Sequence, residues 1–223
     1  GGVIRRPEDF SQAMGRLPVR DTFAYKMSSE ERKELGAAIL VGSMGYVTLA
    51  EIAERFSVSR ATVLNDLDGI KVLVAEAGLR VISKSSHGLM VEGPEGLKRA
   101  FLTDFICRHA PVVDQWMHFP ENGQVKEDTI VIRKILNEQC HAHGINMPDQ
   151  SFGIITNCLC IAVGRVRKGA VLEGYQGCAG ETAETCAAGH GFERGVIELV
   201  AQYCNVSLGI GEVEALAALK RTL

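Results

Sequence analysis

The sequence predicts a mainly α-helical protein: a winged helix-turn-helix of three helices plus a β-hairpin, followed by an all-α helical bundle. Three observations support this fold class. Residues 48–68 contain two short helical patterns joined by a tight turn, and residues 79–92 alternate like the arms of a hairpin. After residue 126 the apolar residues recur at helical spacing. The order of helix, helix-turn-helix and hairpin is that of a winged helix.

The amino-acid composition is ordinary for a globular protein, and it bears on nucleic-acid binding, on the redox compartment and on membrane insertion. The chain has 223 residues, of which 46% are hydrophobic and 23% charged, and its net charge is −3. No overall basic field favours nucleic acid, so any DNA contact has to be a local patch. Seven cysteines, an odd number, are typical of a reducing cytoplasm. No run is apolar enough for a membrane span, and no signal-peptide pattern is present. We expect a cytoplasmic protein with no membrane partner.

Residues 1–27 are interpreted as a lead-in. They open with two glycines and without Met, which suggests a fragment of a longer protein, and they are a candidate for the end of a missing first winged helix. Ser28 and Glu31 then form a capping-box pattern that predicts a helix running to about Leu40. The first domain is predicted to cover residues 28–94.

The helix-turn-helix pattern rests on caps and periodicity that agree. Thr48 with Glu51 is a second capping box, residues 57–59 interrupt the helical spacing, and Ser59 is a good N-cap for the next helix. That helix has an apolar stripe of Val63, Leu67, Ile70 and Val74. Small and polar residues lie opposite, as a helix entering the DNA major groove requires; they are Ala61, Asn65 and Asp68. The alternative is a plain helical hairpin within a bundle.

Candidate DNA contacts follow from this arrangement. Thr62 and Asn65 are expected to read base edges. The backbone contacts are expected from Ser57, Ser59, Arg60 and, at the tip of the hairpin, Lys84, Ser86 and His87. The alternative for the tip is a solvated polar turn. Asp66 lies near the buried edge of its helix, and we expect it to make a structural bond within the winged helix.

The second half is expected to be helical. Residues 95–125 are interpreted as a linker, with a helix to about residue 109 and a loop after it that contains two prolines. Residues 126–223 are interpreted as a bundle of about five helices. These are expected at residues 129–142 and 149–168, in a short piece near 181–187, in an amphipathic segment marked by Phe192 to Tyr203, and from about Gly211 to the end.

The winged-helix half resembles the second helix-turn-helix of bacterial regulators built around phosphotransferase-system regulation domains, and the same segment occurs in Mga-type virulence regulators. The resemblance is carried by YVTLAEIAERFSVSRATVLNDL, GLRVISKSSHGLMVEG and the LKR at residues 97–99. The bundle resembles the regulation domain itself, through residues that include IAVGRVRKG at 161–169 and Glu212. The antiterminators of the BglG type belong to the same family.

This resemblance implies a transcription regulator of sugar utilisation that binds DNA, acts as a homodimer and is contacted by phosphotransferase-system proteins. Family regulation domains carry two histidines that are phosphorylated. Here the matching positions are Cys158 and Leu219, so no phosphorylation site is expected. Leucine cannot accept a phosphoryl group, and Cys158 lies in an apolar run that should raise its pKa and keep the thiol inert. The implied role of the bundle is dimerisation or scaffolding.

No catalytic or cofactor motif is present, so an enzyme is not expected. Cys158, Cys160, Cys178 and Cys186 lack the CxxC spacing of a zinc site, and no metal is expected. The main rival to a DNA reader is an interaction and dimerisation module whose DNA contact is made by a missing N-terminal domain. RNA antitermination is a third hypothesis.

Overall fold

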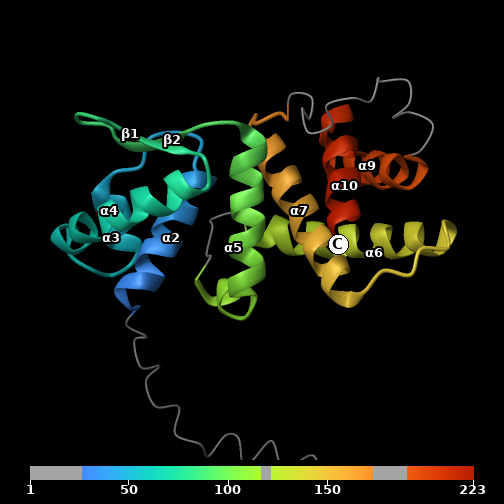
Figure 1. The fold of residues 1–223 in the computed structure, drawn as a ribbon, viewed down its shortest axis with the longest axis horizontal. Coiled ribbons are helices and arrows are strands. Elements are labelled where there is room, and N and C mark those ends of the chain that lie inside the picture. Colours follow the sequence, from blue (N-terminus) through green and yellow to red (C-terminus); the bar gives the residue numbers. More distant parts are fainter. Residues whose placement is uncertain (1–26, 117–121, 173–189) are drawn as a thin grey trace, which may run out of the picture.

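The structure is a computed structural model that describes residues 27–116, 122–172 and 190–223. It is mainly helical, with one small two-stranded sheet (Figure 1). The winged-helix half consists of α2 (Ser29–Gly42), α3 (Leu49–Arg55), α4 (Arg60–Glu76), β1 (Arg80–Lys84) and β2 (Gly88–Glu92). The second half consists of α5 (Glu95–Trp116), α6 (Asn122–Ala142), α7 (Asp149–Arg167), α9 (Gly191–Cys204) and α10 (Ile210–Thr222). The predicted fold class is confirmed.

Helix α2 begins where the capping box predicts. The Ser28 hydroxyl accepts a hydrogen bond from the Glu31 N–H at 3.2 Å, and the Ser28 N–H donates to the Glu31 carboxylate at 2.8 Å. Helix α2 then packs closely on α4. A Cβ placed on Gly36 would lie 2.7 Å from Cδ1 of Ile70, so the glycine lets the two helices approach. Ile70 itself is completely buried in the core beneath them.

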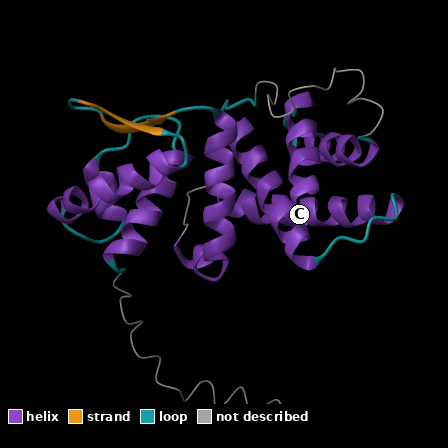
Figure 2. Cartoon of the chain, viewed as in Figure 1, coloured by secondary structure: helices purple, strands orange, loops and turns teal. Residues whose placement is uncertain are grey.

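The hairpin is a regular antiparallel pair whose register runs from Arg80 opposite Glu92 to Lys84 opposite Gly88. Val47, just before α3, forms an isolated β-bridge with Leu89 of β2, and the two residues exchange backbone hydrogen bonds of 2.7 and 2.8 Å. Gly88 is required at this contact, since a Cβ there would lie 2.3 Å from the Val47 carbonyl oxygen. The bridge fixes the hairpin to the segment that precedes α3, and the strands pack against α4 and α2 as a wing (Figure 2).

Two hydrophobic cores lie on either side of α5. The first is built from α2, α3, α4 and the wing, and the second from α6, α7, α9 and α10. Figure 1 shows α5 standing between these two groups of helices. Leu102 and Phe105 of α5, together with Ile161 of α7, belong to the first core. The segment predicted as a linker therefore supplies buried side chains to the winged helix and also packs against α7.

The predicted loop after residue 109 is wrong in its extent. Helix α5 continues through Pro111 to Trp116, and α6 begins at Asn122 instead of near Thr129. A proline inside a helix removes one backbone hydrogen bond but does not by itself end the helix. Gly123 lies in the first turn of α6, where the N–H groups lack intrahelical partners in any case.

Tyr203, one of the residues that mark the predicted amphipathic segment, lies outside its buried stripe, since the residue is 67% exposed. The buried stripe of α9 follows a spacing of four through Val196, Val200 and Cys204. Cys204 therefore occupies the inward position, and its neighbour Tyr203 turns outward. The short helix predicted at residues 181–187 lies outside the described residues. In the part of the chain that the structure describes, no helix combines the length and apolarity that a bilayer crossing demands.

Candidate nucleic-acid interface

The turn between α3 and α4 is set by its own sequence. The Thr48 side chain accepts from the Glu51 N–H at 3.2 Å and the Glu51 carboxylate accepts from the Thr48 N–H at 2.6 Å, which starts α3 as predicted. Ser57 has a φ of 53°, a left-handed conformation that ends α3. The Val58 N–H then donates back to the Ala53 carbonyl at 3.0 Å and closes the turn.

Ser59 caps α4 and contacts the side chain of Thr62, one of the residues predicted to bind DNA. Its hydroxyl accepts from the Thr62 N–H at 3.1 Å and lies 2.9 Å from the Thr62 hydroxyl. Thr62 is half-buried, and its hydroxyl already has a partner within the protein. A base contact through this hydroxyl would compete with the cap. The base-reading role of Thr62 stays a prediction.

The outer face of α4 is open within the chain. Arg60, Ala61, Asn65 and Asp68 are all exposed, and Figure 1 shows α3 and α4 on the side of α5 away from the helical bundle. The stripe predicted to face inward is buried throughout, in Val63, Leu67, Ile70 and Val74. Nothing in the described part of the chain covers the surface that would enter a major groove.

Leu64 is a candidate contact that sequence reasoning missed. It lies on the outer face between Ala61 and Asp68, and 56% of its side chain is exposed. A leucine on the exposed face of such a helix can contact a thymine methyl group, the apolar feature of the major groove. The available signal was its spacing of three residues from Ala61 and four from Asp68.

Asp66 is buried and structural, as the sequence suggests. Its carboxylate accepts from the Arg32 Nε at 2.7 Å and from the Ser29 hydroxyl at 2.7 Å. Burial alone would raise the pKa of Asp66, but the hydrogen bonds from Arg32 and Ser29 and the charge of Arg32 outweigh it and hold the pKa below its ordinary value. The pair fixes the start of α2 against the middle of α4.

The wing tip holds three of the predicted contacts together. Lys84, Ser86 and His87 are exposed, and Ser86 adopts a left-handed φ of 63° at the turn. The Nδ1 atom of His87 lies 3.0 Å from the Ser85 carbonyl oxygen, so this nitrogen is engaged within the wing. Nε2 is then the ring nitrogen left for a phosphate oxygen.

Tyr46 is a second residue that the sequence did not single out. The Nζ of Lys84 lies 5.8 Å from the centre of its ring, and the His87 ring meets it edge-on at 5.8 Å between centroids. Tyr46 precedes Val47, whose backbone pairing with Leu89 brings it beside the wing. Pairing between Val47 and Leu89, which are far apart in the sequence, cannot be predicted from local periodicity.

The electrostatics of the domain are nearly neutral. Residues 28–94 carry nine acidic and seven basic side chains. On the outer face of α4, exposed Asp68 pairs with Lys71 at 3.2 Å. Phosphate attraction must therefore come from a few placed cations, of which Arg60 and Lys84 lie at the start of α4 and on the wing.

Comparison with known protein families agrees with this geometry. Residues 33–90 match a family model described as an HTH domain, and the match covers most of α2, all of α3, the turn and α4, and most of the wing. These residues form a helix-turn-helix domain. The helix-turn-helix domain indicates a DNA-binding transcription regulator, a class that is generally not enzymatic. The match spans about a quarter of the chain, and no curated protein matches it.

The two positions at which the family resemblance places histidines lie together. Cys158 on α7 and Leu219 on α10 both line one cavity between these helices and α5. Burial raises the pKa of the Cys158 thiol to about 11, helped by the nearby charge of Glu212. Cys160 follows two residues later on α7, whereas Cys178 and Cys186 lie outside the described residues. Among the described residues, no cluster of three or more His, Cys, Asp or Glu could hold a metal.

Proposed function

We propose that this chain is a DNA-binding transcription regulator of carbohydrate utilisation, which reads its operator through α4 and the wing. The observation that carries the proposal is the exposed outer face of α4 within a helix-turn-helix domain. The sugar-related role rests on the resemblance to regulators of the phosphotransferase system. We place the protein in the cytoplasm, where its proposed DNA target lies.

In this proposal each element has its own task. Asn65 contacts a base edge in the major groove, with Leu64 beside it on the same face. Ser57, Ser59 and Arg60 contact the phosphates on one side of the groove. Lys84, Ser86 and His87 hold the backbone from the wing, with Tyr46 beneath two of these side chains.

We further propose that two copies bind together. A nearly neutral domain offers few phosphate contacts, so one copy alone would bind weakly at physiological salt. A homodimer on paired half-sites doubles those contacts. Phosphotransferase-system proteins remain candidate partners of the helical half. Cys158 and Leu219 favour a scaffold that receives no phosphoryl group at those positions.

Selection of a binding sequence from random duplex DNA, followed by affinity measurements, tests the proposal. Arg60→Ala should weaken binding to all sequences and lower the salt slope by about 1. Asn65→Ala should cost about 1–3 kcal/mol and relax the preference at one base position. Arg194→Ala and Asn137→Ala, exposed positions on α9 and α6, are the matched controls and should bind like wild type. Equal affinity of wild type and Arg60→Ala at low salt would contradict the proposal.

A second candidate function is an interaction and dimerisation module of a regulator that contacts DNA elsewhere. The observation in its favour is the acidic excess of residues 28–94, together with exposed Asp68 on the outer face of α4. The salt dependence separates the two functions. A protein that reads DNA loses affinity for its DNA site steeply as the salt concentration rises. An interaction module binds DNA only weakly and with no sequence preference.

A further inference from the structure

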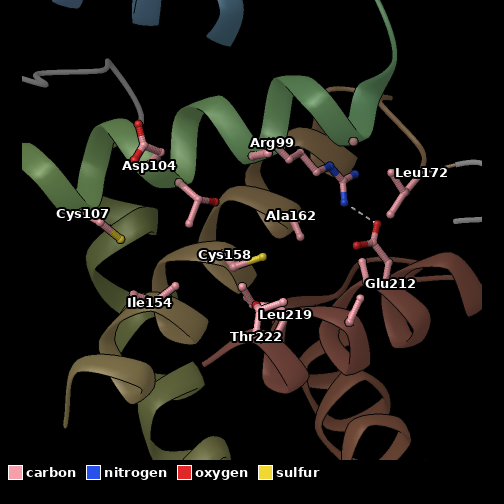
Figure 3. Close-up of a pocket in the computed structure, with 15 residues that line it drawn as sticks. Arg99, Asp104, Cys107, Ile154, Cys158, Ala162, Leu172, Glu212, Leu219 and Thr222 are labelled. Carbon is pink, nitrogen blue, oxygen red and sulfur yellow. Dashed lines mark hydrogen bonds and ion pairs between the residues drawn. The ribbon is translucent and has the colours of Figure 1, made fainter. Parts of the chain in front are cut away.

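A cavity of about 440 Å³ lies between α5, α7 and α10, away from the α4 surface. Figure 3 shows side chains from all three helices converging on it, with Cys158 on one wall and Leu219 on another. This volume is within the range of small-molecule sites, about 300–1,000 Å³. The space between the three helices stays open because several of the residues that line it are small. These residues are Gly96, Ala100, Ala162, Ala215 and Ala218.

One buried polar group in the cavity wall lacks a regular hydrogen bond. Thr103 of α5 is 9% exposed, and its Oγ1 is buried without a hydrogen-bond partner, with the thiol of Cys158 as its polar neighbour. A threonine hydroxyl in a helix often bonds the carbonyl four residues earlier, as Thr156 does at 2.7 Å. Thr103 does not, although a buried hydroxyl without a partner is costly. Its hydroxyl is a natural contact for a ligand.

The charges at the end of the cavity are balanced among themselves. Arg99 donates to Glu212 at 2.5 Å and to Glu95 at 2.9 Å, and Glu95 is paired in turn with Arg165. At the opposite side Asp104 pairs with Arg108 at 2.8 Å. The positive charges of Arg99 and Arg165 are therefore balanced by Glu95 and Glu212. The carboxylate of Asp104 is paired separately with Arg108. No charge in this set is left over for an ionic ligand.

We propose that this cavity binds a small, uncharged and largely apolar molecule that carries one hydroxyl group. The apolar walls take the body of the ligand, and Thr103 Oγ1 exchanges a hydrogen bond with its hydroxyl. An anion would be disfavoured because Glu212 lines the cavity and Arg99 is already satisfied. The site lies beside the Arg99 network that joins α5 to α7 and α10, so its occupant is positioned to act on the junction of the two halves.

The test uses the whole chain and three fluorescent probes of one shape: 2-naphthol, naphthalene and 2-naphthoate. We expect 2-naphthol to bind with a dissociation constant on the order of 0.1 mM. Naphthalene should bind about 3- to 10-fold more weakly because it lacks the hydroxyl. The anion 2-naphthoate should be weaker than 2-naphthol by at least about tenfold. Tighter binding of 2-naphthoate than of 2-naphthol would overturn the proposal.

Two variants locate the binding. Thr103→Val keeps the shape of the side chain and should weaken 2-naphthol about 3- to 10-fold while leaving naphthalene unchanged. Ala218→Phe should fill the cavity and abolish binding of both probes, whereas Ala142→Phe, at the exposed end of α6, should change neither. Circular dichroism verifies that each variant is folded.

These binding measurements contain no DNA, so their outcome does not depend on whether the proposed DNA-binding function is right. Loss of binding in Ala142→Phe as well as Ala218→Phe would overturn the site assignment. If no probe binds and Ala218→Phe instead dissociates a dimer seen by sedimentation, the cavity is an interface between copies and the ligand proposal fails.

Discussion

Arg165 on α7 and Glu95 in the first turn of α5 form a buried ion pair at the junction between the helical half and the winged helix. The guanidinium contacts both carboxylate oxygens, through Nε and, at 2.7 Å, through Nη2. Its Nη1 also donates to the carbonyl oxygens of Val41 and Gly42 at the end of α2, at 3.1 and 3.4 Å. One side chain thus satisfies the C-terminal carbonyls of α2 and the charge of α5.

Removing this arginine should destabilise the whole chain. Arg165→Met leaves the α2 carbonyls unsatisfied and Glu95 with Arg99 alone, and we expect a loss of about 3 kcal/mol in the free energy of unfolding. Urea denaturation followed by circular dichroism measures it. Arg80→Met removes an exposed pair with Glu92 and should cost less than about 1 kcal/mol. Equal losses in the two variants would show that the buried Arg165 side chain does not stabilise the junction of the two halves.

Acid should weaken the fold through Asp66 and Glu95. Burial opposes ionisation of both, but arginine hydrogen bonds dominate and lower each pKa from ordinary values of 3.8 and 4.5. A pKa that is lower in the folded state stabilises the fold above the unfolded value, and this contribution is lost as the pH falls through the folded value. Unfolding free energies should therefore be level above about pH 5 and fall below about pH 4.

A substitution at Asp66 separates its contribution to the acid sensitivity from that of Glu95. Asp66→Asn should lower stability at neutral pH and show a shallower decline between about pH 5 and pH 3 than wild type. Asp68→Asn, whose side chain is exposed on the same helix, should keep the wild-type decline. Urea titrations at several pH values make the comparison. An unchanged decline in Asp66→Asn would exclude Asp66 as a source of the acid sensitivity.

The turn of the helix-turn-helix stores backbone strain at Ser57. Its φ of 53° is unfavourable for a side-chain-bearing residue, so Ser57→Gly should stabilise the chain by about 0.5 kcal/mol. Ser59→Gly is the matched control: Ser59 has an extended φ of −75° and caps α4, so glycine there should destabilise by a few tenths of a kcal/mol. Thermal unfolding of both variants gives the signs. Stabilisation by both would refute the strain argument.

Tyr46 should matter for DNA binding through its ring. Tyr46→Leu removes the contacts with Lys84 and His87 and is expected to weaken DNA affinity about two- to fivefold, with little change in stability. Tyr46→Phe keeps the ring and should bind like wild type. Tyr203→Leu, on an exposed ring of α9, should also bind like wild type. A loss of affinity in Tyr46→Phe would assign the effect to the hydroxyl instead.

Local signals predicted the helix-turn-helix well. The caps at Ser28, Thr48 and Ser59 lie where expected, because a cap is an interaction within three residues. The extent of α5 was missed because Pro111 looks like a stop when only the local pattern is considered. Tyr46 and Leu64 were missed because one depends on a distant strand and the other on the exact rotation of a helix.

The sequence by itself determined which segments become helices and hairpin, and which face of α4 is apolar, since caps and periodicity act over a single turn. Only the tertiary structure decided that α5 supplies side chains to the first core while packing against α7, and that Arg165 reaches the end of α2 from 123 residues away. It also brought Cys158 and Leu219 to one cavity. These relationships depend on how helices cross and on which side chains remain at the crossing, and packing fixes them only when the whole chain is folded.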